Sequence, residues 1–178
     1  ILPDKYLENA AYFEKEKRYD RSAENLEKAI RSIWKIQNDV DNESFDRLED
    51  VVKKLEALHA SLAKDSFNSH DINKDFNFAL KNLAHAELEI AEMYAETEHF
   101  DQSKIALKYA QLHIKNAMLY HSPFWKESTE NLVVEEQVFD RLDSLITSQT
   151  TSVADHVFTI DALIKQVDSL IVKPIGKT

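Results

Sequence analysis

The sequence predicts an all-α protein, an antiparallel bundle of six or seven helices with an internal duplication of a three-helix unit. Three observations support this fold class. Apolar residues recur at helical spacing along almost the whole chain of 178 residues. The chain has three prolines and a single glycine, Gly176, whereas a β-rich or nucleotide-binding fold needs several glycines for its turns. One short stretch also occurs twice.

The repeated stretch reads RYDRSAENLEKA at 18–29 and HFDQSKIALKYA at 99–110, with an offset of 81 residues. Each copy spans the end of one helix, a turn and the start of the next helix. A small residue after the turn lets the two helices cross closely, and a leucine one turn later fills the space beside it. The aligned pairs are Ala10 and Ala91, Phe13 and Tyr94, Tyr19 and Phe100, Ser22 and Ser103, Leu26 and Leu107, and Ala29 and Ala110.

The first three helices are expected at about 3–17, 20–38 and 43–65, with Asp20 as the N-cap of the second. Polar clusters separate them: KRYD, NDVDNES and, after the third, KDSFNSHD. The third helix has a predicted core stripe of Phe45, Leu48, Val52, Leu55, His59 and Leu62.

The fourth helix, at about 72–97, is apolar around a wide arc and is expected at the centre of the bundle. Glu87 is the one polar member of an apolar stripe on this helix. We expect it at the margin of the arc rather than buried. The predicted core residues of this helix are Phe76, Ala79, Leu80, Leu83, Ala86, Ile90 and Met93, with Ala84, Leu88, Ala91 and Ala95 on a second side.

The last three helices are expected at about 101–121, 128–148 and 152–172. Asp101 is placed to cap the first of them, and Pro123 ends it because proline cannot continue a helix. The final helix has an apolar stripe at alternating steps of four and three, which is typical of a helix seated in a bundle groove. Its members are Val153, Val157, Ile160, Ile164, Val167 and Ile171.

A second echo, FDRL at 45–48 and 139–142, has an offset of 94 residues. It suggests that the sixth helix corresponds to the third, with an insertion. We therefore expect one helical domain, 1–178, whose possible halves are 1–66 and 71–148, with a sealing helix at 152–172.

The repeated stretch resembles the tetratricopeptide repeat, a helical hairpin with small residues where its two helices cross and an aromatic residue at the turn. The residues aligned above carry the resemblance over about a third of the chain. Tandem repeats of that family return about every 34 residues, whereas these copies lie 81 residues apart. We therefore expect two similar hairpins inside a compact bundle rather than a solenoid with a peptide-binding groove.

Charge and composition exclude several kinds of partner. A formal net charge of −10 argues against nucleic acid, whose binding depends on clustered Lys and Arg. No apolar run approaches the roughly 20 residues that cross a bilayer, so no membrane insertion is expected. The absence of Cys excludes disulfides and thiolate sites. Since the sequence does not begin with Met, export after signal removal is slightly favoured over a trimmed N-terminus, and the compartment stays open.

Two histidines on inward faces, His59 and His113, suggest an alternative function in which the bundle interior holds a metal ion or small ligand. EALH at 56–59 has the Glu-x-x-His spacing of dinuclear-iron bundles, which would add Glu56. Glu87 is a further candidate. No second well-placed Glu-x-x-His motif accompanies EALH. The favoured interpretation is therefore that neighbouring polar groups satisfy the histidines, and no cofactor is expected.

The stretch MLYHSPFWKE gathers aromatic residues at a helix break. Loops on rigid scaffolds often hold binding residues, but large side chains also plug the ends of bundles. Without a complete catalytic set, we expect a non-enzymatic interaction or scaffold protein of unknown oligomeric state that binds a protein or peptide partner. Its surface is expected here, or in a groove lined by helices 3–17 and 72–97. The candidate partner-binding residues are Tyr120, His121, Phe124 and Trp125.

Overall fold

The computed structural model describes residues 2–64, 69–121, 128–149 and 152–171. All regular structure in these ranges is helical, which confirms the all-α bundle. The helices lie within a few residues of the expected bounds. They are α1 (Pro3–Lys15), α2 (Tyr19–Gln37), α3 (Asn42–Leu62), α4 (Ser69–Glu96), α5 (Phe100–Ala117), the short 3-10 helix η1 (Met118–Tyr120), α6 (Ser128–Thr147) and α7 (Val153–Leu170).

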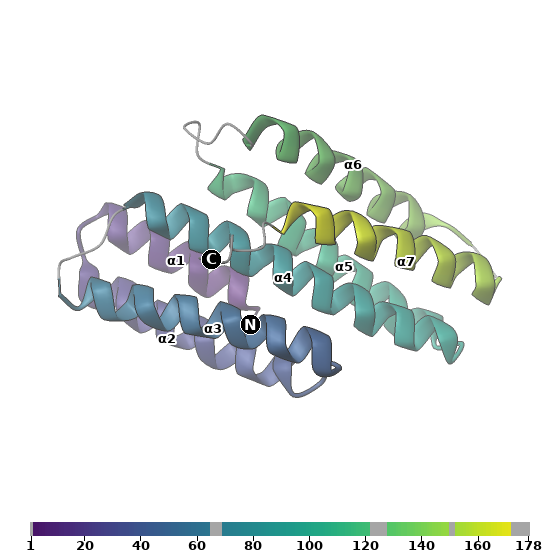
Figure 1. The fold of residues 1–178 in the computed structure, drawn as a ribbon, viewed down its shortest axis with the longest axis horizontal. Helices are drawn as coiled ribbons and strands as arrows, with labels where there is room; N and C mark the ends of the chain where they lie inside the picture. The colour runs from purple at the N-terminus through teal and green to yellow at the C-terminus, as the bar shows by residue number, and fades with distance from the viewer. Residues whose placement is uncertain (1, 65–68, 122–127, 150–151, 172–178) are drawn as a thin grey trace, which may run out of the picture.

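The long helix α4 belongs to two sets of four helices. In the first set α1 contacts α2, α2 contacts α3, α3 contacts α4, and α4 contacts α1. In the second set α4, α5, α6 and α7 contact one another in the same cyclic order. Figure 1 shows the first set on the left and the second on the right, with α4 running through both. The prediction of a central fourth helix is therefore confirmed.

Each set has its own apolar core. The first half of α4, through Phe76, Leu80 and Leu83, packs with residues of α1, α2 and α3. The second half, through Leu88 and Ala91, packs with residues of α5, α6 and α7. The wide apolar arc of α4 is explained by these neighbours, since a helix covered on several sides must be apolar on several sides.

The two repeated hairpins have the same turn. Lys17 and Glu98 both adopt left-handed backbone conformations, with φ of 57° and 62°. After them, the Arg18 amide donates to the Phe13 carbonyl and the His99 amide donates to the Tyr94 carbonyl, both at 2.8 Å. These are Schellman endings, in which a left-handed residue closes a helix and satisfies its last carbonyls.

The crossing after the turn is also the same. The Ser22 hydroxyl donates to the Ala10 carbonyl at 2.7 Å, and the Ser103 hydroxyl donates to the Ala91 carbonyl at 2.8 Å. The predicted role of the two serines is confirmed, because a larger side chain would hold the helices apart. The equivalence covers these hairpins; it does not establish duplication of a whole three-helix unit.

Four residues are placed differently from the prediction. Asp20 and Asp101 are not N-caps, because the helices that follow Lys17 and Glu98 begin one residue earlier than expected. Both aspartates lie in the first turn, where their charge complements the helix dipole. Phe45, in the first turn of α3, and Met93, in the last turn of α4, are exposed rather than in the core.

The FDRL echo does not mark equivalent positions. Phe45 lies in the first turn of α3, whereas Phe139 lies in the second half of α6. A four-residue match is short enough to arise from the shared needs of two amphipathic helices.

Candidate functional site

An apolar stripe lies on the solvent side of α5. Ile105, Tyr109 and Leu112 follow one another at steps of four and three, which places them on one face of the helix. Ile105 is 52% exposed and Tyr109 is 39% exposed, while Leu112 is half-buried. We call these three residues the α5 stripe. Large apolar side chains in a row are unusual on a helix face that nothing covers.

The equivalent face of α2 is charged. With the offset of 81 residues, Glu24, Lys28 and Arg31 occupy the positions of the α5 stripe, and all three are exposed. Lys28 pairs with Glu24 at 2.6 Å, and Arg31 pairs with Glu27. This face is an ordinary solvated surface supported by ion pairs one turn apart.

A hollow of about 340 Å³ lies where the α5 stripe meets the beginning of α1. Its wall is apolar at Leu2, Leu112 and Leu119. Its polar side chains come from both helices and from η1. They are Asp4, Lys5, Glu8, Asn116 and Tyr120. This hollow is lined by α1, α5 and η1, so it is not the groove predicted between helices 3–17 and 72–97, which stays a prediction.

Asp4 is held at the floor of this hollow. His113 Nδ1 lies 2.7 Å from its Oδ2, and the Asn116 amide donates to its Oδ1 at 2.7 Å. Burial opposes ionisation of Asp4, but the hydrogen bonds and charge of His113 and the hydrogen bond of Asn116 outweigh it and lower its pKa. Asp4 is therefore a fixed carboxylate.

Glu87 is buried beside this pair, with 7% of the residue exposed, so the expectation of a marginal position is wrong. It lies on α4, near enough to His113 of α5 and Asp4 of α1 for their charges to act on its carboxyl. Its pKa is raised to about 7, because burial and, to a smaller extent, the charge of Asp4 outweigh the opposing charge of His113.

A second buried pair joins α4 to α6. Lys81 Nζ lies 2.8 Å from Glu135 Oε1, with both side chains almost fully buried. His121 Nε2 contacts the other oxygen of Glu135. Lys81 also donates to the carbonyl of Leu170, at the end of α7, at 3.4 Å. The lysine therefore ties the first half of α6 and the C-terminal end of α7 to the centre of α4.

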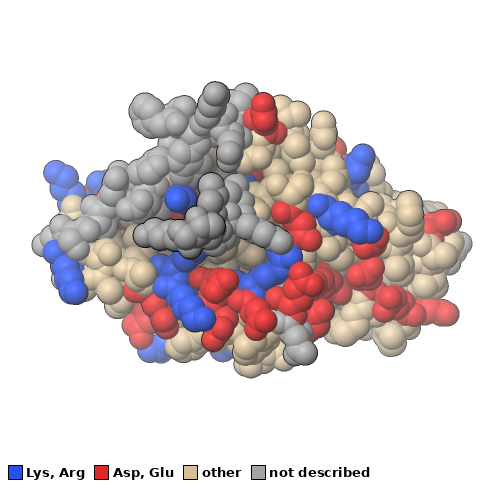
Figure 2. All heavy atoms as spheres, viewed as in Figure 1, with Lys and Arg blue, Asp and Glu red and all other residues tan. Residues whose placement is uncertain are grey.

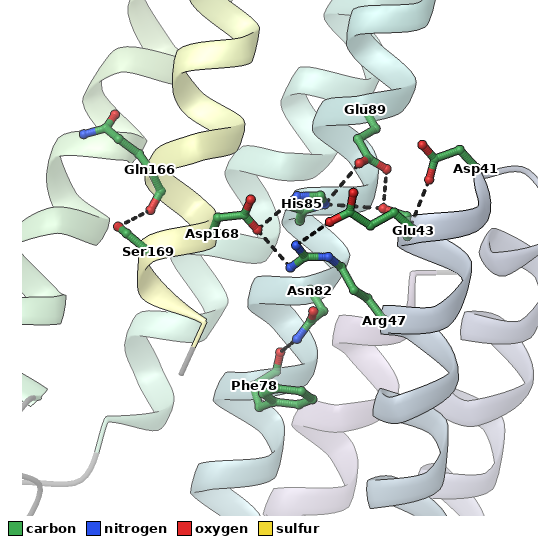
Figure 3. Close-up of polar contacts among 11 residues, drawn as sticks. Asp41, Glu43, Arg47, Phe78, Asn82, His85, Glu89, Gln166, Asp168 and Ser169 are labelled. Atoms are coloured by element: carbon green, nitrogen blue, oxygen red, sulfur yellow. Dashed lines mark hydrogen bonds and ion pairs between the residues drawn. The ribbon is translucent and has the colours of Figure 1, made fainter. Parts of the chain in front are cut away.

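A third polar cluster joins α3, α4 and α7 (Figure 3). Arg47 Nη1 lies 2.9 Å from Asp168 Oδ1, and His85 Nε2 lies 3.2 Å from the same oxygen. On the other side of the ring, His85 Nδ1 lies 3.3 Å from the Ser44 hydroxyl, which donates to Glu89. Side chains from three helices thus meet around one imidazole.

This cluster contains serine, histidine and aspartate, but its geometry does not suit a nucleophile. Ser44 is only 1% exposed, and its hydroxyl donates to Glu89 rather than to the ring. Burial and the charge of Arg47 lower the pKa of His85 against the charges of Asp168 and Glu43. The pKa of Glu89 is raised to about 7, because burial and the charges of Asp41 and Glu43 outweigh the Ser44 hydrogen bond and the charge of Arg47. We interpret the cluster as a polar joint between the two helix sets.

The predicted partner-binding corner divides into three parts. Tyr120 is 8% exposed, and its ring packs edge-on against Phe76 with 5.4 Å between centroids. His121 is half-buried and contacts Glu135. Phe124 and Trp125 lie outside the described residues.

The residues of the metal alternative are not brought together into a ligand set. His113 is buried as predicted and bonds Asp4, whereas Glu56 is exposed. His59 is half-buried and lines a different, larger hollow of about 760 Å³ beside the α1–α2 turn. Within the described ranges, no three His, Cys, Asp or Glu side chains are grouped so that they could hold a metal ion.

Sequence reasoning missed the α5 stripe and Asp4. The signal for the stripe was present, because the same offset that aligns Ser22 with Ser103 aligns Glu24 with Ile105 and Lys28 with Tyr109. Asp4 had no such signal, since its partner lies far away along the chain.

Acidic and basic side chains of the described residues are both present on the face drawn in Figure 2. A band of Asp and Glu crosses its lower middle, over α3, with Lys and Arg interspersed. Across the described helices, none is both long and apolar enough to cross a membrane.

Comparisons with known proteins supply no relative. No family model, curated protein or solved structure matches this chain. The tetratricopeptide resemblance therefore has no support beyond the two hairpins.

Proposed function

We propose that this chain is a non-enzymatic binding protein whose protein or peptide partner docks on the α5 stripe. One observation carries the proposal. On two hairpins with the same turn and the same crossing, the face that is charged on α2 is apolar and exposed on α5. The fold itself does not require apolar residues there, because α2 folds without them.

Exposed apolar residues occur elsewhere too, including Trp34, Phe158 and Leu119. Single residues of this kind are normal on a protein surface. The α5 stripe differs because its spacing of four and three is the spacing at which an amphipathic helix presents apolar anchors to a partner. Tyrosine is also among the residues enriched at the centres of interfaces.

The alternative function, a metal ion or small ligand held in the bundle interior, has weaker support. One ring nitrogen of each of the buried histidines His85 and His113 lies against a carboxylate, and the described residues hold no group of three His, Cys, Asp or Glu side chains that could bind a metal ion.

Photocrosslinking from equivalent positions tests the proposal. A benzophenone amino acid replaces Tyr109 in one variant and Lys28 in the other, each expressed in the cells that make the protein. We expect one discrete adduct from position 109 and none from position 28. Adducts of equal yield from both positions, or none from either, would contradict docking on α5, and an adduct of twice the chain mass would replace the partner with a second copy.

A matched exchange provides the control. Ile105→Glu combined with Tyr109→Lys gives α5 the residues that α2 has at the same positions, and the pair is compatible with a helix surface. The exchanged variant should fold normally. In a pull-down, it should no longer bind the partner that the crosslink from position 109 identifies. Leu112 is left unchanged because it also lines the hollow.

A further inference from the structure

The α5 stripe lies in the longest part of the sequence that has no acidic residue. Asp and Glu together number 32 in the chain, yet none occurs between Asp101 and Glu127. No other interval between successive acidic residues is half as long. Beyond its first turn, α5 therefore carries no negative side chain of its own, although the whole chain has a formal net charge of −10.

Two lysines run along one flank of the stripe. Lys108 is three residues after Ile105, and Lys115 is three residues after Leu112, so both lie on the same side of the apolar row. Both lysines are exposed. Among the residues that the structure describes, neither ammonium group has an ion-pair partner. The exposed face of α5 thus joins an apolar row to a cationic one.

The equivalent positions of α2 show how a solvated face satisfies its charges. The offset of 81 residues aligns Lys108 with Glu27, which pairs with Arg31 at 2.5 Å. It aligns Ile105 with Glu24, which is likewise paired with a lysine one turn away. Both anions of α2 are missing from α5. The counter-charges of the α5 lysines therefore have to come from outside the helix.

Acidic side chains of the neighbouring helices lie at the margins of this face and are engaged there. Glu8 of α1 pairs with Lys5 at 2.7 Å. Asp143 of α6 accepts a hydrogen bond from the Gln111 amide at 3.3 Å. Salt screens exposed charges over about 8 Å at physiological ionic strength. A segment that lies on the stripe is therefore affected more by the two lysines beside it than by the net charge of the chain.

The fold also restricts the conformation of a docked segment. The described residues form no strand, so they offer no sheet edge to which an extended peptide could add main-chain hydrogen bonds. A helix can cover an apolar row on another helix, because the ridges of one fit into the grooves between side chains three and four residues apart on the other. The α5 stripe has this spacing.

We propose that the partner docked on the α5 stripe is an acidic amphipathic helix, whose apolar face covers the stripe and whose Asp or Glu side chains pair with Lys108 and Lys115. This inference rests on the proposed function and adds the chemical class of the partner. A second copy of the chain lacks the complementary charge, since isologous packing of α5 on α5 would bring the same lysines together.

Three helical peptides test the partner class. They share leucines at steps of four and three and differ at the flanking positions, which are all Glu, all Gln or all Lys. Fluorescence anisotropy measures their affinity for the full chain. We expect the Glu peptide to bind about tenfold more tightly than the Lys peptide, because two exposed ion pairs are gained and two repulsions are avoided. High salt should reduce this difference.

Matched lysine variants locate the preference. Lys108→Gln combined with Lys115→Gln should remove the preference for the Glu peptide and leave the affinity for the Gln peptide unchanged. Glutamine is as good a helix former as lysine, so the variant should fold. The control is Lys35→Gln combined with Lys165→Gln, which removes exposed lysines from α2 and α7 and should keep the preference. Circular dichroism checks the helix content of each variant.

The inference is overturned if the three peptides bind alike, if none of them binds saturably, or if the Lys108→Gln, Lys115→Gln protein still prefers the Glu peptide. The proposed function is judged separately, by the photocrosslink from position 109. Mass spectrometry of that adduct should find an acidic, amphipathic segment. A crosslink to a basic segment or to a second copy would overturn the inference alone, whereas no adduct would overturn both.

Discussion

The α1–α2 and α4–α5 hairpins share a backbone but differ in the face that they expose. Both end their first helix on a left-handed, non-glycine residue, and both cross through a serine bonded to an alanine carbonyl. Their exposed stripes are charged on α2 and apolar on α5. The difference teaches that the apolar residues of α5 are not a requirement of the hairpin.

The inner faces differ at one position as well. Tyr6 of α1 is half-buried against the first core, and its equivalent on α4 is the buried Glu87. The second hairpin therefore accepts a carboxyl where the first has an aromatic ring. A buried carboxyl is costly when ionised, so this position lowers stability under conditions that ionise it.

The largest effect should be equal in the two hairpins. Leu26 and Leu107 are fully buried at the equivalent point of each crossing. Leu26→Ala and Leu107→Ala should each lower the free energy of unfolding by about 2–5 kcal/mol, because each leaves a cavity. Denaturant unfolding measures both. A loss well under 1 kcal/mol for one variant alone would show that the crossings are not packed alike.

A pH profile should separate the hairpins at Glu87. The folded carboxyl keeps its proton up to about pH 7, whereas in the unfolded chain it ionises near its ordinary value of about 4.3. The folded state thus binds more protons in between, and the free energy of unfolding falls as pH rises through this window. Glu87→Gln should remove a fall of about 3–4 kcal/mol, because each unit of pKa difference is worth about 1.4 kcal/mol.

The measurement is chemical denaturation of both proteins at intervals from pH 4.5 to 8. Glu49→Gln is the control, since it removes an exposed carboxylate. If the free energy of unfolding changed with pH in the same way for the wild type and Glu87→Gln, the Glu87 carboxyl would be ionised in the folded protein throughout this window.

The smallest effect concerns the two serines. Ser22→Ala and Ser103→Ala each remove one buried hydrogen bond without changing the helix spacing, at about 1 kcal/mol each. Thermal unfolding should show two similar decreases. If Ser103→Ala had no effect while Ser22→Ala did, its contact of 3.5 Å with His156 would be the place to look for compensation.

Helix positions could be predicted from the sequence because the helical period is a local property. The bounds of α1, α2 and α6 are within two residues of those expected. The predicted caps at Asp20 and Asp101 failed, since a left-handed Lys17 or Glu98 has no reliable sequence signal in the way that glycine has.

Burial was harder to predict than helicity. Met93 and Glu87 both lie on the apolar arc of α4, yet the first is exposed and the second is buried. Which part of an arc is covered depends on where the neighbouring helices end, and that is a property of the whole fold. The pairs His113 with Asp4 and His85 with Asp168 join residues far apart in sequence, so no local pattern indicates them.

The sharing of α4 by both helix sets has a consequence for how the protein comes apart. If one set unfolded alone, half of α4 would lose the residues that pack against it, and the other set depends on the same helix. Buried charges such as Lys81 would also be left unpaired. Local openings are therefore confined to the outer helices, and loss of α4 coincides with global unfolding. Amide protons in the middle of this helix are the ones that exchange with solvent last.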